Sequence, residues 1–308
     1  MSKTLLLTGS NGLLGKAILR NLPSHIKPIT FNSCDIDLTN RFEAEGLFNL
    51  ATPIDLCIHA AAKVGGVGAH IGKHSKFFYD NSLMNLHIID LCKQYNVKSL
   101  LAISSVAAFP HNCSYLTEDL ICDGKVHESE RGYALSKRII DDQIQLYRQE
   151  YGVNFCNIIP TNLYGPEDNF NILTGHVIAS LIAKIYLAKQ NNTDLEVWSD
   201  GLSLRQFLYV DDFARILIQL LDFDHLPDRL LVSQPKTYNI RDVADILRLL
   251  IGFSNNIIYN YNDLSGIRAR EVNISRLASL MDLKFTPLEE GLRTTLHWYI
   301  NNYELART

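Results

Sequence analysis

The sequence predicts an α/β protein, with a doubly wound parallel sheet in a larger N-terminal domain and a smaller mixed domain after it. Short apolar runs alternate with helical patterns over the first half of the chain, and a glycine turn joins the first such pair. Strands that alternate with helices are typical of parallel sheets. Hydrophobic residues make up 47% of the 308 residues, so the chain can bury a large core without disulfides.

The strands and helices of the first domain follow one another in a regular order. Lys3–Thr8 is an apolar run that predicts a strand, and LLGKAILRNL after it has the spacing of a helix. The predicted elements that follow are strand Ile26–Phe31, helix Arg41–Leu50, strand Pro53–Ala62, helix Ser82–Tyr95, strand Val97–Ser104, helix Gly132–Tyr151 and strand Val153–Pro160. This order is the one expected of a parallel sheet covered by helices.

After residue 165 the alternation loosens. Helical patterns occur in HVIASLIAKIYLA, VDDFARILIQLL, VADILRLL and GLRTTLHWYI, and LEVWSD predicts a short strand. We therefore predict one domain at residues 1–165 and a smaller one at residues 166–308, with some segments of the second returning to the first.

Charge and composition argue against several classes of partner. The formal net charge is -4 and there is no dense run of lysine and arginine, which argues against nucleic-acid binding. No signal-peptide pattern opens the chain, and no window approaches the ~20 apolar residues of a membrane span. The six cysteines lack CxxC spacing, which favours reduced thiols, and nothing indicates a metal. We expect a cytoplasmic protein.

The glycine turn TGSNGLLG lies between the first strand and the first helix. In such a turn the first glycine permits the tight bend, the second lets the backbone approach a pyrophosphate, and the third allows close packing of helix and strand. The N–H groups at the start of the helix then bind the anion. The sequence thus predicts a Rossmann-like dinucleotide site whose contacts are Gly9, Ser10, Asn11, Gly12, Leu13, Leu14 and Gly15.

The end of the second strand influences the choice of nicotinamide cofactor. An acidic residue there favours NAD, and an arginine accommodates the 2′-phosphate of NADP. The segment TFNSCDIDLT has no arginine, and its acids Asp35 and Asp37 come late. We expect Asp37 and Leu38 near the adenine, and the residues alone leave the cofactor choice open.

Tyr133 and Lys137 in RGYALSKRIIDD are four residues apart and so share one face of a helix. A phenol has an ordinary pKa of about 10. A nearby ammonium favours the phenolate, which makes proton exchange feasible at neutral pH. Alone the pair also fits an ordinary amphipathic helix. The order of glycine turn, strand ending in Ser104 and Ser105, and YxxxK resembles the extended short-chain dehydrogenase/reductase superfamily.

Longer stretches narrow this resemblance. The segments AAAKVGGVGAH, PTNLYGPEDNF, GHVIASL and VWSDGLSLRQFLYVDD are similar to the GDP-L-fucose synthase family, and the likeness extends along essentially the whole chain. The resemblance implies an NADPH-dependent enzyme that acts on a GDP-linked 4-keto-6-deoxy sugar. Asn11 and Ser33 stand where the family has arginines near the 2′-phosphate, so NADH stays open as an alternative cofactor.

The resemblance also implies a role for each matching residue. Ser105 would hydrogen-bond the C4 oxygen of the sugar, Tyr133 would give it a proton, and Lys137 would bind the nicotinamide ribose and lower the tyrosine pKa. His176 matches a histidine that acts as an acid in epimerisation and lies close to the cofactor. Other implied cofactor contacts are Ala60, Ala61, Pro160, Thr161, Asn162 and Leu163. Implied substrate contacts are Asn162, Lys184, Trp198, Arg205 and Arg270, where a lysine is usual.

One position departs from the family where the chemistry depends on it. The family has a cysteine two residues after the serine, which removes protons alpha to the C4 ketone, and this chain has Ala107. A methyl group cannot carry a proton, and Cys113 could reach the site only from a loop. The sequence therefore predicts a C4-reductase, for a hexose or a heptose, that has lost the epimerase base. A bifunctional GDP-L-fucose synthase, or an NAD-dependent nucleotide-sugar epimerase or dehydratase, is the alternative.

The resemblance further implies a homodimer that pairs through the helix carrying YxxxK and its neighbour. Candidate contacts on that helix are Ile139, Ile140, Ile144 and Leu146.

Overall fold

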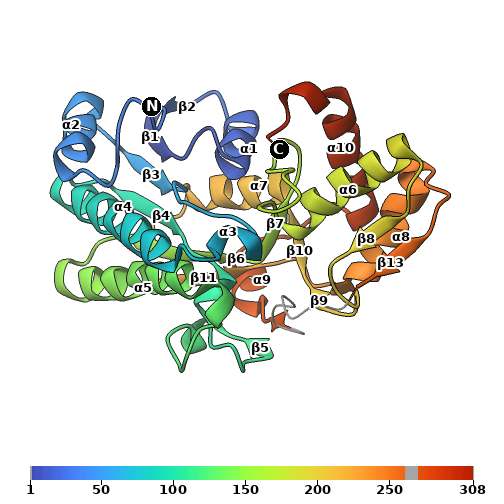
Figure 1. Cartoon of the computed structure of the whole chain (residues 1–308). Coiled ribbons are helices and arrows are strands. Elements are labelled where there is room, and N and C mark those ends of the chain that lie inside the picture. Colours follow the sequence, from blue (N-terminus) through green and yellow to red (C-terminus); the bar gives the residue numbers. More distant parts are fainter. Residues whose placement is uncertain (1, 261–269, 308) are drawn as a thin grey trace.

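The structure is a computed structural model that describes residues 2–260 and 270–307, and its centre is a six-stranded sheet (Figure 1). The strand order is β11-β6-β4-β3-β1-β2 and every pairing is parallel. The strands are β1 (Lys3–Thr8), β2 (Ile26–Ile29), β3 (Leu56–His59), β4 (Ser99–Ile103), β6 (Phe155–Pro160) and β11 (Arg229–Val232). The predicted parallel sheet is confirmed.

Helices cover both faces of this sheet. They are α1 (Leu13–Asn21), α2 (Arg41–Ala51), α4 (His74–Gln94), α5 (Arg131–Tyr151), α7 (Val210–Leu220) and α9 (Ser275–Leu280). Side chains alternate between the faces of a strand, so Leu5 and Leu7 of β1 pack in the cluster of α1 and α7, while Leu6 packs in that of α2, α4 and α5. The fold is therefore doubly wound, as predicted.

The largest difference from the sequence prediction is the start of α4. The helix predicted at 82–95 begins eight residues earlier, at His74. Its first two turns contain the consecutive residues Phe77, Phe78 and Tyr79, which mask the helical spacing of apolar side chains. The strand predicted at 53–62 is also shorter, because only residues 56–59 pair with neighbouring strands.

The smaller layer lies beside the carboxyl ends of the strands, on the right of Figure 1, where β7 follows directly after β6. Helices α6 (Val177–Asn191), α8 (Ile240–Ile251) and α10 (Leu288–Asn301) share one core with short strand pairs. The pairs are β7 (Asn162–Tyr164) with β10 (Phe207–Tyr209), β8 (Leu195–Val197) with β13 (Ile257–Tyr259), and β9 (Leu204–Arg205) with β12 (Tyr238–Asn239). A fourth pair, β5 (Tyr115–Leu116) with β14 (Glu271–Val272), packs in a separate cluster with β6 and β11. The remaining short helices are α3 (Val67–His70), η1 (Val106–Ala108), η2 (Glu118–Leu120), η3 (Glu128–Glu130) and η4 (Tyr303–Leu305).

Two features join the layers. Strand β11 follows residue 165 in the chain yet pairs with β6 in the central sheet, and α7 packs on α1. The backbone of Gly66 also approaches the 173–175 segment, where its N–H donates to Thr174 O at 2.8 Å. A Cβ on Gly66 would lie 2.3 Å from Gly175 O, so only glycine fits. The segment before His176 is thereby held against the N-terminal half.

Within residues 2–260 and 270–307, none of the helices combines the length and the apolar character needed to cross a bilayer.

Candidate active site

The glycine turn has the shape that a dinucleotide requires. Gly9 has a φ of +73° and a Cβ there would lie 2.7 Å from Ala61 N, so a side chain is excluded. A Cβ on Gly15 would lie 2.2 Å from Gly9 O, which fixes α1 close to the turn. Gly12 begins the helix without a side-chain cap, and Leu13 and Leu14 follow it at the cavity. The uncapped N–H groups are suited to a phosphate.

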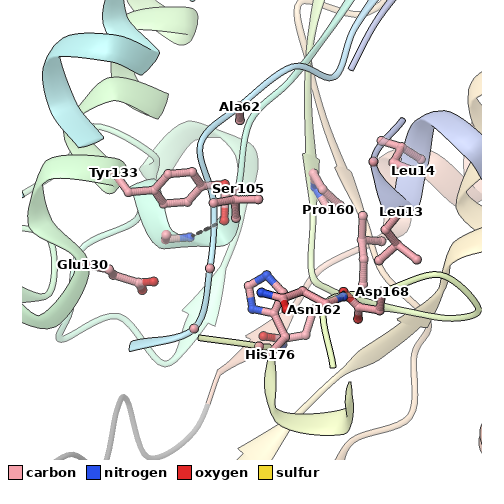
Figure 2. A pocket seen from close by; sticks show the side chains of 18 of the residues that line it. Leu13, Leu14, Ala62, Ser105, Glu130, Tyr133, Pro160, Asn162, Asp168 and His176 are labelled. Atoms are coloured by element: carbon pink, nitrogen blue, oxygen red, sulfur yellow. Dashed lines mark hydrogen bonds between the residues drawn. The ribbon is translucent and has the colours of Figure 1, made fainter. Parts of the chain in front are cut away.

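Ser105 and Tyr133 lie next to each other (Figure 2), where β4 ends beside α5, and Lys137 follows one turn later on α5. The Ser105 hydroxyl accepts a hydrogen bond from the Ala107 N–H at 3.1 Å and hydrogen-bonds the Tyr133 phenol. Lys137 Nζ donates to Ile103 O at 2.7 Å and lies 5.6 Å from the centroid of the Tyr133 ring. The three side chains predicted to be catalytic are thus brought together.

Burial controls the protonation of this group. Burial raises the pKa of Tyr133 above its ordinary value, Glu130 raises it further, and the hydrogen bond with Ser105 opposes the rise. Burial also lowers the pKa of Lys137 to about 7. Lys137 is not among the groups that shift the pKa of Tyr133 here, so a lowering of the tyrosine pKa by Lys137 stays a prediction. The phenol keeps its proton at neutral pH, which is the state that a proton donor needs.

A buried polar network fixes α5 against the sheet. Ser104 Oγ donates to Lys137 O at 3.2 Å, and Asn85 Nδ2 donates to Ser136 O at 2.9 Å. Asn85 Oδ1 in turn lies 3.1 Å from His59 Nε2, and burial lowers the pKa of that histidine to about 3. The neutral His59 also contacts Thr8 at the end of β1. The positions of Tyr133 and Lys137 are thereby tied to the strand ends that carry the glycine turn.

One cavity of about 1200 Å³ joins this group to the glycine turn, a volume at or above the range of ordinary small-molecule pockets. Every residue predicted to belong to the site lines it. Those beyond the turn and the catalytic group are Asp37, Leu38, Ala60, Ala61, Pro160, Thr161, Asn162, Leu163, His176, Lys184, Trp198, Arg205 and Arg270. Figure 2 shows His176, Asn162 and Pro160 facing Ser105 and Tyr133 across the cavity.

The cations at the far end of the cavity differ in how much of their hydrogen-bonding capacity is already used. Lys184 Nζ lies 3.3 Å from the centroid of the Trp198 ring, and burial lowers the lysine pKa to about 8. Arg205 donates once, to Leu204 O at 2.8 Å. Arg270 instead donates to Val106 O, Phe109 O and Pro110 O. Its guanidinium thus holds the 106–110 loop, which leaves it less to offer a phosphate than the sequence suggested.

Sequence reasoning missed two acids that line the cavity. Glu130 lies one helical turn before Tyr133, and that spacing was the available signal. Asp168, inside the motif PTNLYGPEDNF, is 3% exposed, and its Oδ1 accepts from the Asn169 N–H at 2.7 Å. Its Oδ2 is buried without a hydrogen-bond partner among the described residues. Burial raises the pKa of Asp168, and the charge of His176 opposes that rise.

Ala107 lies in the cavity wall beside Ser105 and is 5% exposed. It packs with Val126 and Phe77, so its surroundings are apolar. The Cys113 thiol donates to Tyr115 O at 3.1 Å, and no cysteine is among the described residues that line the cavity. The wall beside Ser105 thus carries the methyl group of Ala107, and the Cys113 thiol is engaged outside the cavity.

Replacing Lys137 by Met is expected to change the pH dependence of stability. With a folded pKa near 7 against an ordinary 10.5, the charged lysine costs stability most below pH 7. Between pH 7 and pH 10.5 the unfolded chain binds more protons at Lys137 than the folded chain does. This group therefore makes the free energy of unfolding of the wild type rise with pH, by at most about 1.4 kcal/mol per pH unit. The free energy of unfolding of the Lys137→Met variant should not show this rise. Urea unfolding at pH 6 and pH 9.5 measures it, and parallel pH profiles would contradict it.

The fold and these side chains define an oxidoreductase of the extended short-chain dehydrogenase/reductase class. A sequence model of the NAD dependent epimerase/dehydratase family matches residues 5–240. The chain belongs to this family and, within it, to the GDP-L-fucose synthase group.

Relatives match along the whole length. The GDP-L-fucose synthase of Dictyostelium discoideum is 35% identical over 313 residues, which cover 99% of this chain and 98% of that protein. The GDP-L-colitose synthase of Yersinia pseudotuberculosis is 29% identical, over 96% of this chain and 98% of that protein. The crystal structure of a GDP-L-fucose synthetase from Naegleria fowleri bound to NADP matches with a TM-score of 0.92 at 31% identity, and covers 99% of this chain and 95% of that chain.

Proposed function

We propose that the protein is an NADPH-dependent C4-reductase of a GDP-linked 4-keto-6-deoxy sugar that does not epimerise C3 or C5. The observation that carries the proposal is the combination of an assembled Ser105, Tyr133 and Lys137 with Ala107 in the adjoining wall. Reduction of a ketone needs a hydride and a proton donor. Epimerisation also needs a base at the alpha carbons, and the wall offers a methyl group there.

In the proposed reaction NADPH, when bound, supplies the hydride for C4 of the sugar. Tyr133 gives its proton to the C4 oxygen, while the Ser105 hydroxyl donates a hydrogen bond to the same oxygen. The raised pKa of Tyr133 keeps that proton available. Lys137 Nζ donates one hydrogen bond to Ile103 O. A lysine ammonium has three donors, so the others can hold the ribose of the cofactor.

The two ends of the cavity suit the two ligands. The turn at 9–15, with Asp37, Ala60 and the 160–163 segment, would hold the dinucleotide, so residues 1–165 form its domain. Residues 166–308 would mainly hold the nucleotide sugar, apart from segments such as β11 that belong to the sheet. Lys184, Trp198 and Arg205 would take the GDP portion, because cations and an aromatic face suit a diphosphate and a base. Six cysteines without disulfides suit a cytoplasmic protein.

The nearest alternative is a bifunctional GDP-L-fucose synthase that uses a different base. His176, which the family uses as an acid in epimerisation, is retained in the cavity, and two acids, Glu130 and Asp168, also line it. The relative from Dictyostelium discoideum carries that name. The sugar of this chain would be a hexose or a heptose.

The test is anaerobic incubation with GDP-4-keto-6-deoxymannose and NADPH, followed by NMR of the product. We expect one NADPH to be oxidised for each C4 alcohol formed, with the configurations at C3 and C5 of the substrate kept. A GDP-L-fucose product would establish the bifunctional alternative. Turnover without net oxidation of NADPH would indicate an epimerase or dehydratase.

We also propose a homodimer that pairs through α4 and α5. Leu146 is 61% exposed and Tyr79 is 63% exposed on these helices. Ile140 and Ile144 are fully buried in the core of the protomer, so the expectation that they contact a partner is wrong.

Light scattering at micromolar concentration is expected to give the mass of a dimer. Leu146→Glu should shift it toward monomer, because a charge on a buried apolar contact is costly. The matched control is Phe42→Glu, which changes an 85% exposed residue on α2. A wild-type monomer would refute the dimer.

A further inference from the structure

The adenosine end of the cavity is built from neutral polar side chains. It lies between the glycine turn and the segment after β2, where Rossmann folds hold the adenosine ribose. Asn11 Nδ2 donates to Asn32 Oδ1, which joins the turn to that segment, and Ser10 Oγ donates to Phe31 O at 3.3 Å. Ser33 is exposed and lines the cavity next to them. These groups offer hydrogen bonds but no charge.

Lys63 and the cations on helices α1 and α2 are engaged in ion pairs. Lys63 lines the cavity, and its ammonium is paired with Asp80. Lys16 and Arg20 on α1 are paired with Glu167. Arg41, at the start of α2, is paired with Asp90 at 2.7 Å.

The charges that line this end are those of Asp37 and of Lys63, whose ammonium is held by Asp80. Asp37 accepts from the N–H and the hydroxyl of Thr39 at 2.9 Å and 2.8 Å, and these bonds lower its pKa, so it stays ionised. Among residues 2–260 and 270–307, no arginine lines this end of the cavity. A 2′-phosphate placed there would find amide and hydroxyl donors, one carboxylate, and cations held by other acids.

We propose that this neutral cradle, formed by Asn11, Asn32 and Ser33, makes the protein use NADH and NADPH with comparable efficiency. Hydrogen bonds to a phosphate from charged donors are about twice as strong as those from neutral ones. A ribose hydroxyl can use the same amide and hydroxyl donors. The cradle therefore has little means to favour the phosphorylated cofactor. The inference rests on the proposed function only in taking a nicotinamide dinucleotide as the ligand, and it widens the cofactor of that function from NADPH to NADPH or NADH.

The test measures the cradle without any sugar. Calorimetric titration with adenosine 2′,5′-bisphosphate and with AMP isolates the 2′-phosphate, because the two probes differ in that group alone. We expect wild-type dissociation constants within about tenfold of each other, since the cation at this end, Lys63, is already paired with Asp80. The dissociation constants of NADPH and NADH should differ by the same factor as those of the two probes. A preference above about 100-fold for the phosphorylated probe would overturn the proposal, because that range requires a charged donor.

Ser33→Arg supplies the missing charge. It should strengthen binding of adenosine 2′,5′-bisphosphate relative to AMP by about 10- to 100-fold, the range of a hydrogen bond between charged groups. Thr193→Arg is the matched control, because it adds the same charge at an exposed position outside the cavity. If the ratio of the dissociation constants for the two probes were the same in both variants and in the wild type, Ser33 would not face the 2′-phosphate. Failure to reduce the sugar would overturn the proposed function and leave these binding ratios unaffected.

Discussion

Tyr133→Phe is expected to lower the rate of C4 reduction by about 10²–10⁴-fold, the usual contribution of a positioned proton donor. The variant removes one oxygen from a phenol that hydrogen-bonds Ser105 and keeps its proton through burial. The ring still fills its place, 5.8 Å from the His70 ring, so the wall of the cavity is kept. Single-turnover oxidation of NADPH, followed by its absorbance, measures the rate.

The affinity of Tyr133→Phe for NADPH is expected to match that of the wild type, since Lys137 and the glycine turn are unchanged. Tyr147→Phe is the matched control: this tyrosine lies on the same helix, and its hydroxyl donates to Asp90 outside the cavity. Its turnover should equal that of the wild type. Unchanged reduction by Tyr133→Phe would remove Tyr133 from the mechanism.

In heavy water the wild-type protein is expected to reduce C4 while adding no enzyme-catalysed deuterium at C3 or C5. Exchange at a carbon alpha to a ketone requires a base within hydrogen-bond reach. The wall beside Ser105 offers the methyl group of Ala107, and the Cys113 thiol donates to Tyr115 O instead. NMR of the product measures the incorporation. An incubation without enzyme gives the slow spontaneous exchange, which is subtracted.

Ala107→Cys places a thiol in the wall, with His176 already in the cavity, and is expected to raise exchange above the wild-type level. The gain depends on placement, because a displacement of about 1 Å can cost ~10²-fold in rate. Rapid exchange by the wild-type protein would contradict the proposed function. Loss of that exchange in His176→Asn would then assign epimerisation to a different base.

Much of the fold could be predicted because its signals are local. Leu5, Leu6 and Leu7 are all buried, as expected of a strand covered on both faces. The glycines at 9 and 15 are required by close backbone contacts, those of Gly15 lying within the turn itself. The residues expected at the site all line one cavity, and most of them belong to a sequence motif next to a strand end.

What could not be predicted depends on contacts between distant segments. The pKa of Tyr133 follows from burial, which no spacing on α5 reveals. Arg270 turns to the carbonyls of the 106–110 loop, about 160 residues away in the chain, so its charge is partly used there. Ile140 and Leu146 look equivalent as apolar residues, yet the first is in the core and the second is exposed.

The position of β11 has a consequence for synthesis of the chain. The first five strands of the sheet are complete once residue 160 has left the ribosome, but the edge of β6 stays open until residue 232 follows. Helix α7, which covers α1, also comes late. During that interval the nascent chain presents a bare strand edge and an uncovered apolar face, the features that chaperones bind and that lead to aggregation. A chain that ends at residue 165 would keep the edge of β6 open and the apolar face uncovered.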